Sequence, residues 1–309
     1  GADAVKFQSW TPTSLIAKEE YDRNQSYNDG DGGKKHFGSL KEMVDKYYLR
    51  EEQHYQLKEF CDTLEITFAS TPFSTYEVNL LEKCEIPFFK IASMDINNYQ
   101  LLRVVAEKGK PVILSTGMAT LSEIDNSVSF LIKNGIEDIA LLHCISIYPP
   151  LYEDINLNNI LMLRKAFGLP IGFSDHTIGT SIPLASIALG ACIIEKHFTT
   201  DKDLPGWDHM ISADPNELKT IRKEGDNIVM AMGSYPRVVS KAEQEKKLKF
   251  RRSIVFTKKL PKGHLITEND LTSKRPGTGI SPDLIPVLVG RKLAQSVEID
   301  TLVEWDQIS

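Results

Sequence analysis

The chain has 309 residues, of which 41% are hydrophobic and 25% are charged, enough for one large α/β domain and a smaller one. Its formal net charge of −6 argues against nucleic acid as the main partner, because a polyanion binder usually carries a basic surplus. No apolar stretch reaches the roughly 18 residues of a membrane helix, and no signal-peptide pattern is found, so we expect a soluble protein without a membrane partner.

Four cysteines lie far apart in the sequence, with no C-x-x-C pair among them. Cys144 and Cys192 fall inside apolar runs that predict buried strands, and Cys61 and Cys84 are equally isolated. We expect reduced core thiols, which favour a cytoplasmic location.

Seven short apolar runs recur along the first 200 or so residues, with helical patterns between them. The runs cover residues 4–8, 66–70, 88–93, 111–116, 139–144, 170–174 and 192–198. A spacing of about 20 to 30 residues from the second run onward is typical of βα units in a parallel sheet. Thr120 and Glu123 form a capping box that predicts a helix ending at Gly135, and helices are also expected over 181–189 and 216–232.

Polar residues lie at or just after the end of nearly every predicted strand. They are Lys6, Thr71, Ser93, Ser115, Ser146, Ser174, His176 and His197. Functional residues at the carboxyl ends of many strands are the layout of a (β/α)₈ TIM barrel. A doubly wound open sheet is the competing fold, but it usually binds its ligand at a single switch point. We therefore predict an α/β protein with a TIM barrel.

The chain opens almost directly on the first predicted strand, and seven strands are found where a barrel needs eight. We expect that the first strand and its helix are absent from this sequence, and that about 30 to 50 further residues precede it in the natural protein. These residues should include a strand that ends in an acidic side chain. A long segment over 9–39, rich in Gly and Asp at its centre, is predicted to form a loop over the barrel mouth.

The sequence changes character near residue 235. We predict a barrel domain over 1–235, a charged linker or solvated helix over 236–252, and a small, mostly β domain over 253–309. Within the small domain, strands are expected at 253–256 and 266–271. A domain of about 60 residues is near the lower size limit for independent stability, so it gains from docking on a barrel or on a partner subunit.

Two histidines give the strongest local signal for chemistry. His176 and His197 each lie at or just past the end of a strand, and the two strands follow one another in the chain. Two imidazoles placed in this way can converge on one divalent metal with open positions, and Glu195 lies on the same strand face as His197. Two hydrogen-bonded histidines without a metal remain the alternative.

A second group of residues suits a phosphorylated, carboxylated substrate. It comprises Lys6, Thr71, Lys90, Ser93, Ser115 and Ser174. A lysine in an apolar strand is costly unless its ammonium reaches an anion or water at the barrel rim, so snorkelling lysines are the alternative. His143 is either a metal ligand or a satisfied core residue, and Tyr148 either contacts substrate or packs beneath a loop.

Several ordered motifs resemble the sialic acid synthase family. They are F-K-I-A-S (89–93), I-L-S-T-G-M (113–118), L-L-H-C-x-S-x-Y-P (141–149), G-F-S-D-H-T (172–177), E-K-H-F-T (195–199) and P-G-x-D-H (205–209). The tail K-G-x-x-I-T-x-x-D-L-x-x-K-R-P-G-x-G-I-S-P (262–282) is similar to the antifreeze-like (SAF) domain that follows the barrel in this family. The resemblance covers nearly the whole chain, and so many motifs in one order are specific.

The resemblance implies a definite reaction, in which phosphoenolpyruvate condenses with the open-chain aldehyde of an N-acetylated amino sugar such as N-acetylmannosamine. The products are a nonulosonic acid of the N-acetylneuraminate type and phosphate, released by C–O cleavage. His176 and His197 would hold Mn²⁺ or Mg²⁺ as a Lewis acid. A homodimer is also implied, in which the small domain of one subunit is swapped onto the barrel of the other.

The resemblance also implies a role for each candidate residue. Those that would bind phosphoenolpyruvate are Lys6, Thr71, Lys90, Ser93, Ser115 and Ser174. Those that would face the sugar are Asp95, Ser146, Tyr148, Asp208 and, from a partner subunit, Arg275. The catalytic set would be His176, His197, Lys90 and Asp208.

The sequence departs from the family pattern mainly on the sugar side. Asp95 stands where a Glu is common, Ser146 where an Asn is common, and Trp207 where a second proline is usual. Two alternatives therefore stay open: a legionaminic or pseudaminic acid synthase that uses a bis-acetamido hexose, and a non-catalytic sugar-binding relative.

Overall fold

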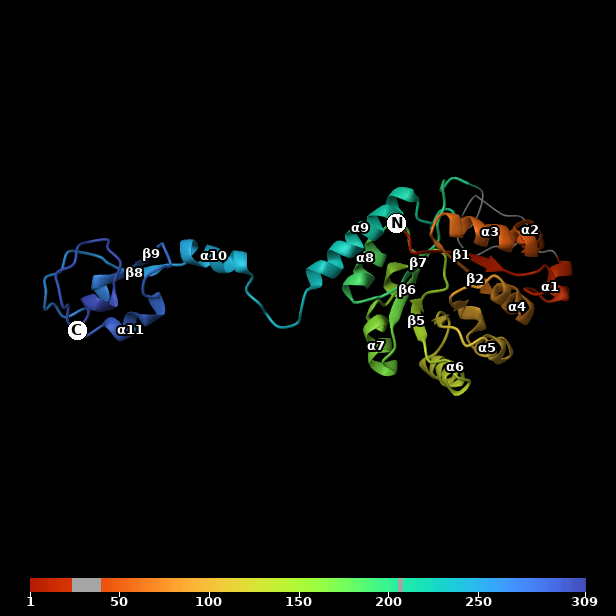
Figure 1. Cartoon of the computed structure of the whole chain (residues 1–309), viewed down its shortest axis with the longest axis horizontal. Helices are drawn as coiled ribbons and strands as arrows, with labels where there is room; N and C mark the ends of the chain where they lie inside the picture. The colour runs from red at the N-terminus through yellow and green to blue at the C-terminus, as the bar shows by residue number, and fades with distance from the viewer. Residues whose placement is uncertain (24–39, 205–207) are drawn as a thin grey trace. The chain divides into compact units, whose positions relative to one another are not determined.

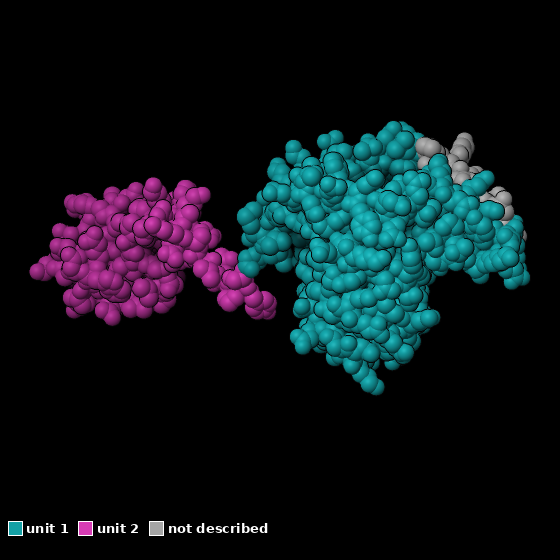
Figure 2. Space-filling view, turned by 45° about the vertical axis from the view of Figure 1, so that its right-hand side comes forward, with its two compact units in different colours: residues 1–233 teal, residues 234–309 magenta. Residues whose placement is uncertain are grey.

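The computed structural model describes residues 1–23, 40–204 and 208–309. They form two compact units, Gly1–Gly233 (unit 1) and Ser234–Ser309 (unit 2), which Figure 2 distinguishes by colour. Residues 24–39 of the loop predicted over 9–39, and the predicted departure at Trp207, lie outside the described ranges, whereas Lys18–Arg23 of that segment form a helix and not a loop.

Unit 1 contains the seven predicted strands, each within two residues of its expected start. They are β1 (Ala4–Ser9), β2 (Thr67–Pro72), β3 (Phe89–Ile91), β4 (Val112–Ser115), β5 (Ile139–Cys144), β6 (Ile171–Asp175) and β7 (Ile194–Lys196). All the pairs are parallel, with β1 bonded to β2 and β3 to β7 bonded in chain order. The predicted α/β class is thus confirmed, whereas the described residues form a curled parallel sheet and not a closed eight-stranded barrel.

Helices lie around the outside of these strands (Figure 1). They are α1 (Lys18–Arg23), α2 (Leu40–Tyr47), α3 (Glu51–Thr63), α4 (Thr75–Lys83), α5 (Tyr99–Ala106), α6 (Leu121–Lys133), α7 (Asn158–Phe167), α8 (Ser181–Ala188) and α9 (Pro215–Met232). The predicted capping box at α6 is present. The Thr120 hydroxyl accepts from the Glu123 backbone N–H, and the Glu123 carboxylate accepts from the Thr120 backbone N–H. Asp214 and Glu217 form the equivalent box at α9.

The curl of the sheet brings its first and last strands toward each other at their carboxyl ends. Lys6 Nζ, on β1, lies 3.9 Å from Glu195 Oε2, on β7. Outside the sheet, Arg222 of α9 donates to both carboxylate oxygens of Asp3 at 2.9 and 2.8 Å. A core of fully buried Phe, Leu and Ile side chains, among them Phe68, Phe89 and Phe173, fills the space between the strands and the helices.

A buried polar network fixes β1 against β2 and α3. Ser9 Oγ lies 2.6 Å from Ser70 Oγ and 2.7 Å from His54 Nε2, and His54 Nδ1 lies 2.9 Å from the Arg50 carbonyl. Each of these buried groups thereby finds a partner, which a buried polar group requires. Because the Ser9 side chain is fully enclosed, we regard this serine–histidine pair as structural.

Unit 2 begins with the exposed helix α10 (Lys241–Phe250) and continues with the antiparallel pair β8 (Ser253–Phe256) and β9 (Leu271–Lys274). The short helix α11 (Ile285–Leu288) and the buried residues around Phe256 complete a second small core. The strand predicted over 266–271 is wrong, because Glu268–Asp270 form a 3₁₀ turn and β9 starts only at Leu271. Asp270 causes this turn by accepting from the backbone and hydroxyl of Thr267.

All four cysteines are free, and Cys61, Cys84 and Cys144 are buried as predicted. Cys192 is exposed, so its assignment to the core is wrong. The reason is that β7 begins only at Ile194, which leaves Cys192 ahead of the strand. Across the described ranges, none of the helices is both long and apolar enough to cross a membrane.

Candidate active site at the carboxyl ends of the strands

Two lysines converge on Glu195 from different strands. Lys90 Nζ, on β3, lies 3.7 Å from Glu195 Oε1, and Lys6 Nζ, on β1, approaches Oε2 of the same carboxylate. Lys90 also donates to Ser115 Oγ at 2.6 Å, and Ser174 Oγ donates to Glu195 Oε1 at 3.1 Å. The structure therefore brings residues of β1, β3, β4, β6 and β7 together at one point.

This cluster is electrostatically polarised. Burial lowers the pKa of Lys90, which is 3% exposed, although the neighbouring Glu195 opposes this. Burial alone would raise the pKa of Glu195, but Lys6, Lys90 and the Ser174 hydroxyl outweigh it and lower that pKa to about 2. Two lysines thus share one carboxylate. A second anion can enter such a site at little electrostatic cost, so the geometry suits a phosphate or carboxylate ligand.

The remaining residues predicted to bind phosphoenolpyruvate lie beside the lysines. Thr71 Oγ1 accepts from Lys6 Nζ at 3.4 Å. Ser93 Oγ accepts from the Gly117 backbone N–H at 3.0 Å, and an added Cβ at Gly117 would lie 2.4 Å from Ser146 Oγ and 2.7 Å from Ser93 Oγ. Only glycine fits between these two hydroxyls, which are therefore neighbours.

The two histidines lie beside this cluster, with ring centres 5.5 Å apart. His176 Nδ1 is 2.7 Å from the Ile145 carbonyl. A carbonyl only accepts, so Nδ1 carries the proton and the Nε2 lone pair remains available. Burial lowers the pKa of His176 to about 4, and burial also lowers the pKa of His197 despite the nearby Asp208, whose Oδ2 lies 3.5 Å from His197 Nδ1.

These histidines fit a divalent metal as an open, two-imidazole donor set, because both rings are neutral near pH 7. Within the described ranges, no cluster of three or more His, Cys, Asp or Glu side chains forms a closed metal cage. A metal held here would therefore depend on water or substrate for its other ligands. His143, the other candidate ligand, is buried in the core, where its Nε2 lies 2.6 Å from the Ile155 carbonyl oxygen.

Two of the residues predicted to face the sugar, Tyr148 and Asp208, lie beside the histidines. The Tyr148 ring packs against that of His176, with centres 4.0 Å apart. Asp95 follows β3 and is 9% exposed; its Oδ1 accepts from Asn98 at 2.9 Å, while its buried Oδ2 has no hydrogen-bond partner. Burial raises the pKa of this carboxyl. Asp95 is thus held in place through one oxygen, while the other is buried and unpaired.

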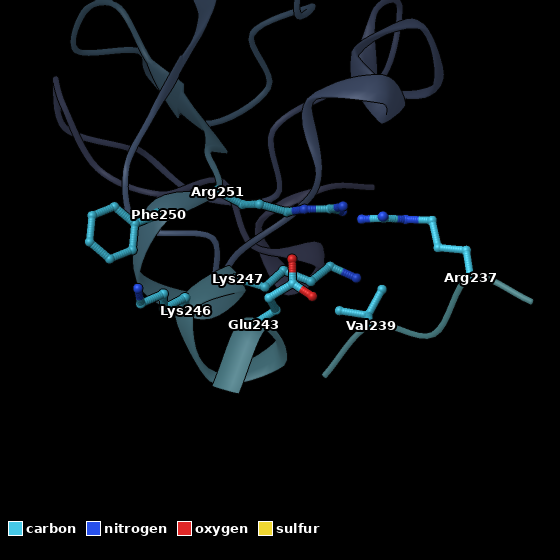
Figure 3. Close-up of a pocket in the computed structure, with 7 residues that line it drawn as sticks. All are labelled: Arg237, Val239, Glu243, Lys246, Lys247, Phe250 and Arg251. Atoms are coloured by element: carbon cyan, nitrogen blue, oxygen red, sulfur yellow. The ribbon is translucent and has the colours of Figure 1, made fainter. Parts of the chain in front are cut away.

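The last predicted residue, Arg275, belongs to unit 2, where its guanidinium lies 5.0 Å from the centre of the Phe250 ring. A cavity of about 520 Å³ lies on the opening segment of this unit (Figure 3). Its lining residues are Arg237, Val239, Glu243, Lys246, Lys247, Phe250 and Arg251. All are exposed and none is among the predicted catalytic residues, so the chemistry is assigned to the strand ends of unit 1.

Three features of the site were under-assigned from the sequence. Glu195 is the electrostatic centre of the lysine cluster, although alternation had indicated only that it shares a face with His197. Gly117 must be a glycine, because a side chain there would collide with the hydroxyls of Ser93 and Ser146. Asp175 and Lys196 form a buried ion pair beside the histidines. The sequence did contain a signal for Asp175 and Lys196, because each is a charged residue next to a histidine in an otherwise apolar strand.

The fold and this site together define a class of protein: a parallel α/β enzyme whose anion-binding lysines and paired histidines lie at the carboxyl ends of the strands. The NeuB family model matches residues 1–236 and the SAF domain model matches residues 251–309. The chain therefore belongs to the NeuB family, with a carboxy-terminal SAF domain. It is an enzyme of the sialic and nonulosonic acid synthase type, so the non-catalytic alternative is set aside.

Named relatives support this membership. The N,N'-diacetyllegionaminic acid synthase of Legionella pneumophila is 38% identical, over 100% of this chain and 86% of its own. Human N-acetylneuraminate-9-phosphate synthase is 31% identical, over 98% and 83%. Among solved structures, N-acetylneuraminic acid synthetase from Leptospira borgpetersenii, crystallised with citrate, is 36% identical with a TM-score of 0.70, and the match covers 79% of each chain.

Proposed function

We propose that this enzyme condenses phosphoenolpyruvate with the open-chain aldehyde of an N-acetylated amino sugar, giving a nonulosonic acid and phosphate. The observation that carries the proposal is the convergence of Lys6, Lys90 and the serine hydroxyls beside His176 and His197. Phosphoenolpyruvate carries both a phosphate and a carboxylate, and a site with two lysines and several hydroxyls suits those two groups.

In this reaction C3 of phosphoenolpyruvate bonds to the aldehyde carbon, and the aldehyde oxygen becomes a hydroxyl by taking one proton that originates from water. The water oxygen bonds to C2 and becomes its carbonyl oxygen as the C2–O bond to phosphate breaks. The second water proton leaves with the phosphate. Lys6, Thr71, Lys90, Ser93, Ser115 and Ser174 bind phosphoenolpyruvate and stabilise the charge that is released on phosphate.

The sugar is held on the histidine side of the cluster. Asp95, with its unpaired Oδ2, and Ser146 contact its polar groups, and Tyr148 packs against it. Asp208, close to His197, orients the aldehyde end. His176 and His197 hold Mn²⁺ or Mg²⁺, which polarises the aldehyde when bound. The sign of the histidine pKa shifts supports this role, because a neutral imidazole is the form that binds a metal.

We further infer that the seven strands belong to a (β/α)₈ barrel and that the enzyme works as a domain-swapped homodimer. The ion pair between Lys6 of β1 and Glu195 of β7 supports a nearly closed sheet. Residues 1–233 hold 33 acidic and 22 basic residues, a net charge of −11, whereas residues 234–309 hold 9 and 14, a net charge of +5. Opposite charges favour docking of an SAF domain, and with it Arg275, on the mouth of a partner's barrel.

Exposed apolar side chains around that mouth support the same docking. They follow the ends of β3 to β7 and include Met94, Met118, Tyr152, Ile178 and Phe198, each at least 47% exposed. Several exposed apolar side chains at one end of a sheet are typical of a surface that a partner covers. The four free thiols support the cytoplasm as the compartment.

The sugar is tested by following phosphate release against a panel of amino sugars at fixed phosphoenolpyruvate and Mn²⁺. N-acetylmannosamine should support release at a rate far above that of phosphoenolpyruvate alone. The second candidate is a bis-acetamido hexose, favoured by the 38% identical legionaminic acid synthase and by the short side chains of Asp95 and Ser146. Release with the bis-acetamido hexose alone would establish the second candidate, and release with neither sugar would contradict the proposed reaction.

A further inference from the structure

A buried ion pair lies between the residues that flank the two histidines. Asp175 and Lys196 are register partners on β6 and β7, each one residue before a histidine. Lys196 Nζ lies 2.6 Å from Asp175 Oδ2, and the two side chains are 2% and 0% exposed. Because side chains alternate along a strand, this pair points to the opposite side of the sheet from Ser174 and Glu195.

The same two side chains also hold the backbone that follows His176. Asp175 Oδ1 accepts from the Thr177 backbone N–H at 2.9 Å, and Lys196 Nζ donates to the Thr177 carbonyl at 2.6 Å. Asp175 and Thr177, on either side of His176, are thus both bonded to Lys196, the residue directly before His197. His176 can shift relative to His197 only by breaking bonds to a fully buried ammonium group.

A buried ion pair is weak evidence for stability, because removing two charges from water offsets much of their attraction. Two apolar residues of similar volume would hold β6 to β7 without that cost. They would not bond both the N–H and the C=O of Thr177. The observed contacts therefore serve position more than stability.

We propose that Asp175 and Lys196 are positioning residues that set the spacing of His176 and His197, and thereby their joint affinity for a divalent cation. The proposal rests on the proposed metal role of the histidines. Neither residue is assigned a substrate contact, because both side chains lie on the opposite side of the sheet from Ser174 and Glu195. Outer partners of metal ligands, when lost, typically cost about 10- to 100-fold in metal affinity.

The test compares Mn²⁺ binding by the full chain before and after Lys196→Met, measured by calorimetry at a temperature where circular dichroism shows both proteins folded. We expect Mn²⁺ to bind about 10- to 100-fold more weakly to the variant. Asp270→Asn is the matched control, because it weakens an ion pair in unit 2 between the buried Asp270 carboxylate and the exposed Lys258. It should lower the unfolding temperature and leave Mn²⁺ affinity unchanged.

The double variant Asp175→Leu/Lys196→Met separates position from stability. Removing both charges should recover much of the stability lost in Lys196→Met, while Mn²⁺ binding stays weak because the bonds to Thr177 are gone. Recovery of affinity together with stability would overturn the proposal. Unchanged Mn²⁺ affinity in the folded Lys196→Met protein would overturn it as well.

A second measurement tests the positioning role of Asp175 and Lys196 independently of metal binding by the histidines. Nitrogen-detected NMR of histidine-labelled protein, with His176 assigned from His176→Ala, should show the Nδ1-protonated form of His176 that the Ile145 contact requires. Lys196→Met should change the His176 and His197 signals, and Asp270→Asn should not. If the wild type binds no Mn²⁺ yet the signals change, the metal role fails and the positioning stands. Unchanged signals would refute the positioning.

Discussion

Lys90 is the residue that links the sequence most directly to the reaction. Its ammonium is buried, bonds Ser115 and lies near Glu195, and burial lowers its pKa. A lysine held in this way costs stability unless it meets an anion, which is why an apolar strand that contains one indicates a binding site.

Lys90→Met should therefore reduce kcat/KM for phosphoenolpyruvate by about 10²- to 10³-fold, the range typical of losing one charge-stabilising donor. Steady-state phosphate release measures this. Lys83→Met is the control, because Lys83 is a surface lysine whose side chain is 65% exposed and pairs with Glu51. Equal losses in the two variants would show that the effect of Lys90 is not local.

Asp270 gives a residue-scale prediction in unit 2. Burial opposes its ionisation, but hydrogen bonds from Lys258, His264 and Thr267 outweigh this and hold its pKa well below the usual range. Its stabilising effect is then full above the unfolded-state pKa of about 3.9 and is lost as the pH falls below it. Urea unfolding at pH 7 and pH 3 should show a gap between wild type and Asp270→Asn that narrows at pH 3. A gap of the same size at both pH values would contradict this assignment.

At the scale of elements, the strands and caps of unit 1 followed from local patterns. Apolar runs with regular spacing located all seven strands, and the Thr120 capping box located the start of α6. The turn at 268–270 did not follow, because it depends on a single buried carboxylate, Asp270, that accepts from Thr267. Cys192 was misplaced because the sequence does not show on which residue a buried strand begins.

The close contact between β6 and the segment that leads into β7 requires a glycine at position 172. An added Cβ would lie 2.5 Å from the Ile193 carbonyl and 2.6 Å from Leu142 Cδ2. Gly172→Ala should therefore lower the free energy of unfolding by about 1 to 3 kcal/mol, as overpacking does. In Gly225→Ala on α9, the added atom meets only the end of the Ile187 side chain at 2.9 Å. A gain in helix propensity offsets that contact, so this variant should be close to neutral in urea unfolding. A neutral Gly172→Ala would contradict the described packing.

At the scale of the whole molecule, the candidate site was harder to predict than the elements, because it combines residues from strands that are far apart in the sequence. Residues far apart in the sequence, such as Lys6 and His197, were expected at one end of the sheet only because the carboxyl ends of parallel strands share one edge. The pairing of Lys6 with Glu195, the fit of Gly117 between two hydroxyls, and the Asp175–Lys196 contact depend on side-chain geometry that a sequence pattern does not contain.

The proposed swapped dimer is tested by complementation. Arg275→Ala and His176→Ala should each be inactive, because one removes the proposed sugar contact and the other a histidine of the proposed metal site. After subunit exchange, mixed dimers should carry one site with both residues intact, so activity should return to about a quarter of the wild-type value if exchange is random. Exchange is confirmed by mass spectrometry of differently tagged chains. Proven exchange without any recovery would place Arg275 at its own barrel.

In the proposed reaction, carbon–carbon bond formation accompanies C–O cleavage of phosphoenolpyruvate. The most direct measurement uses phosphoenolpyruvate labelled with ¹⁸O in the bridging C2–O–P position, incubated with the full chain, Mn²⁺ and the accepted amino sugar. Mass spectrometry should find the label in the released phosphate and none of it in the nonulosonic acid. Label retained in the organic product, or phosphate release that does not require the sugar, would contradict the account.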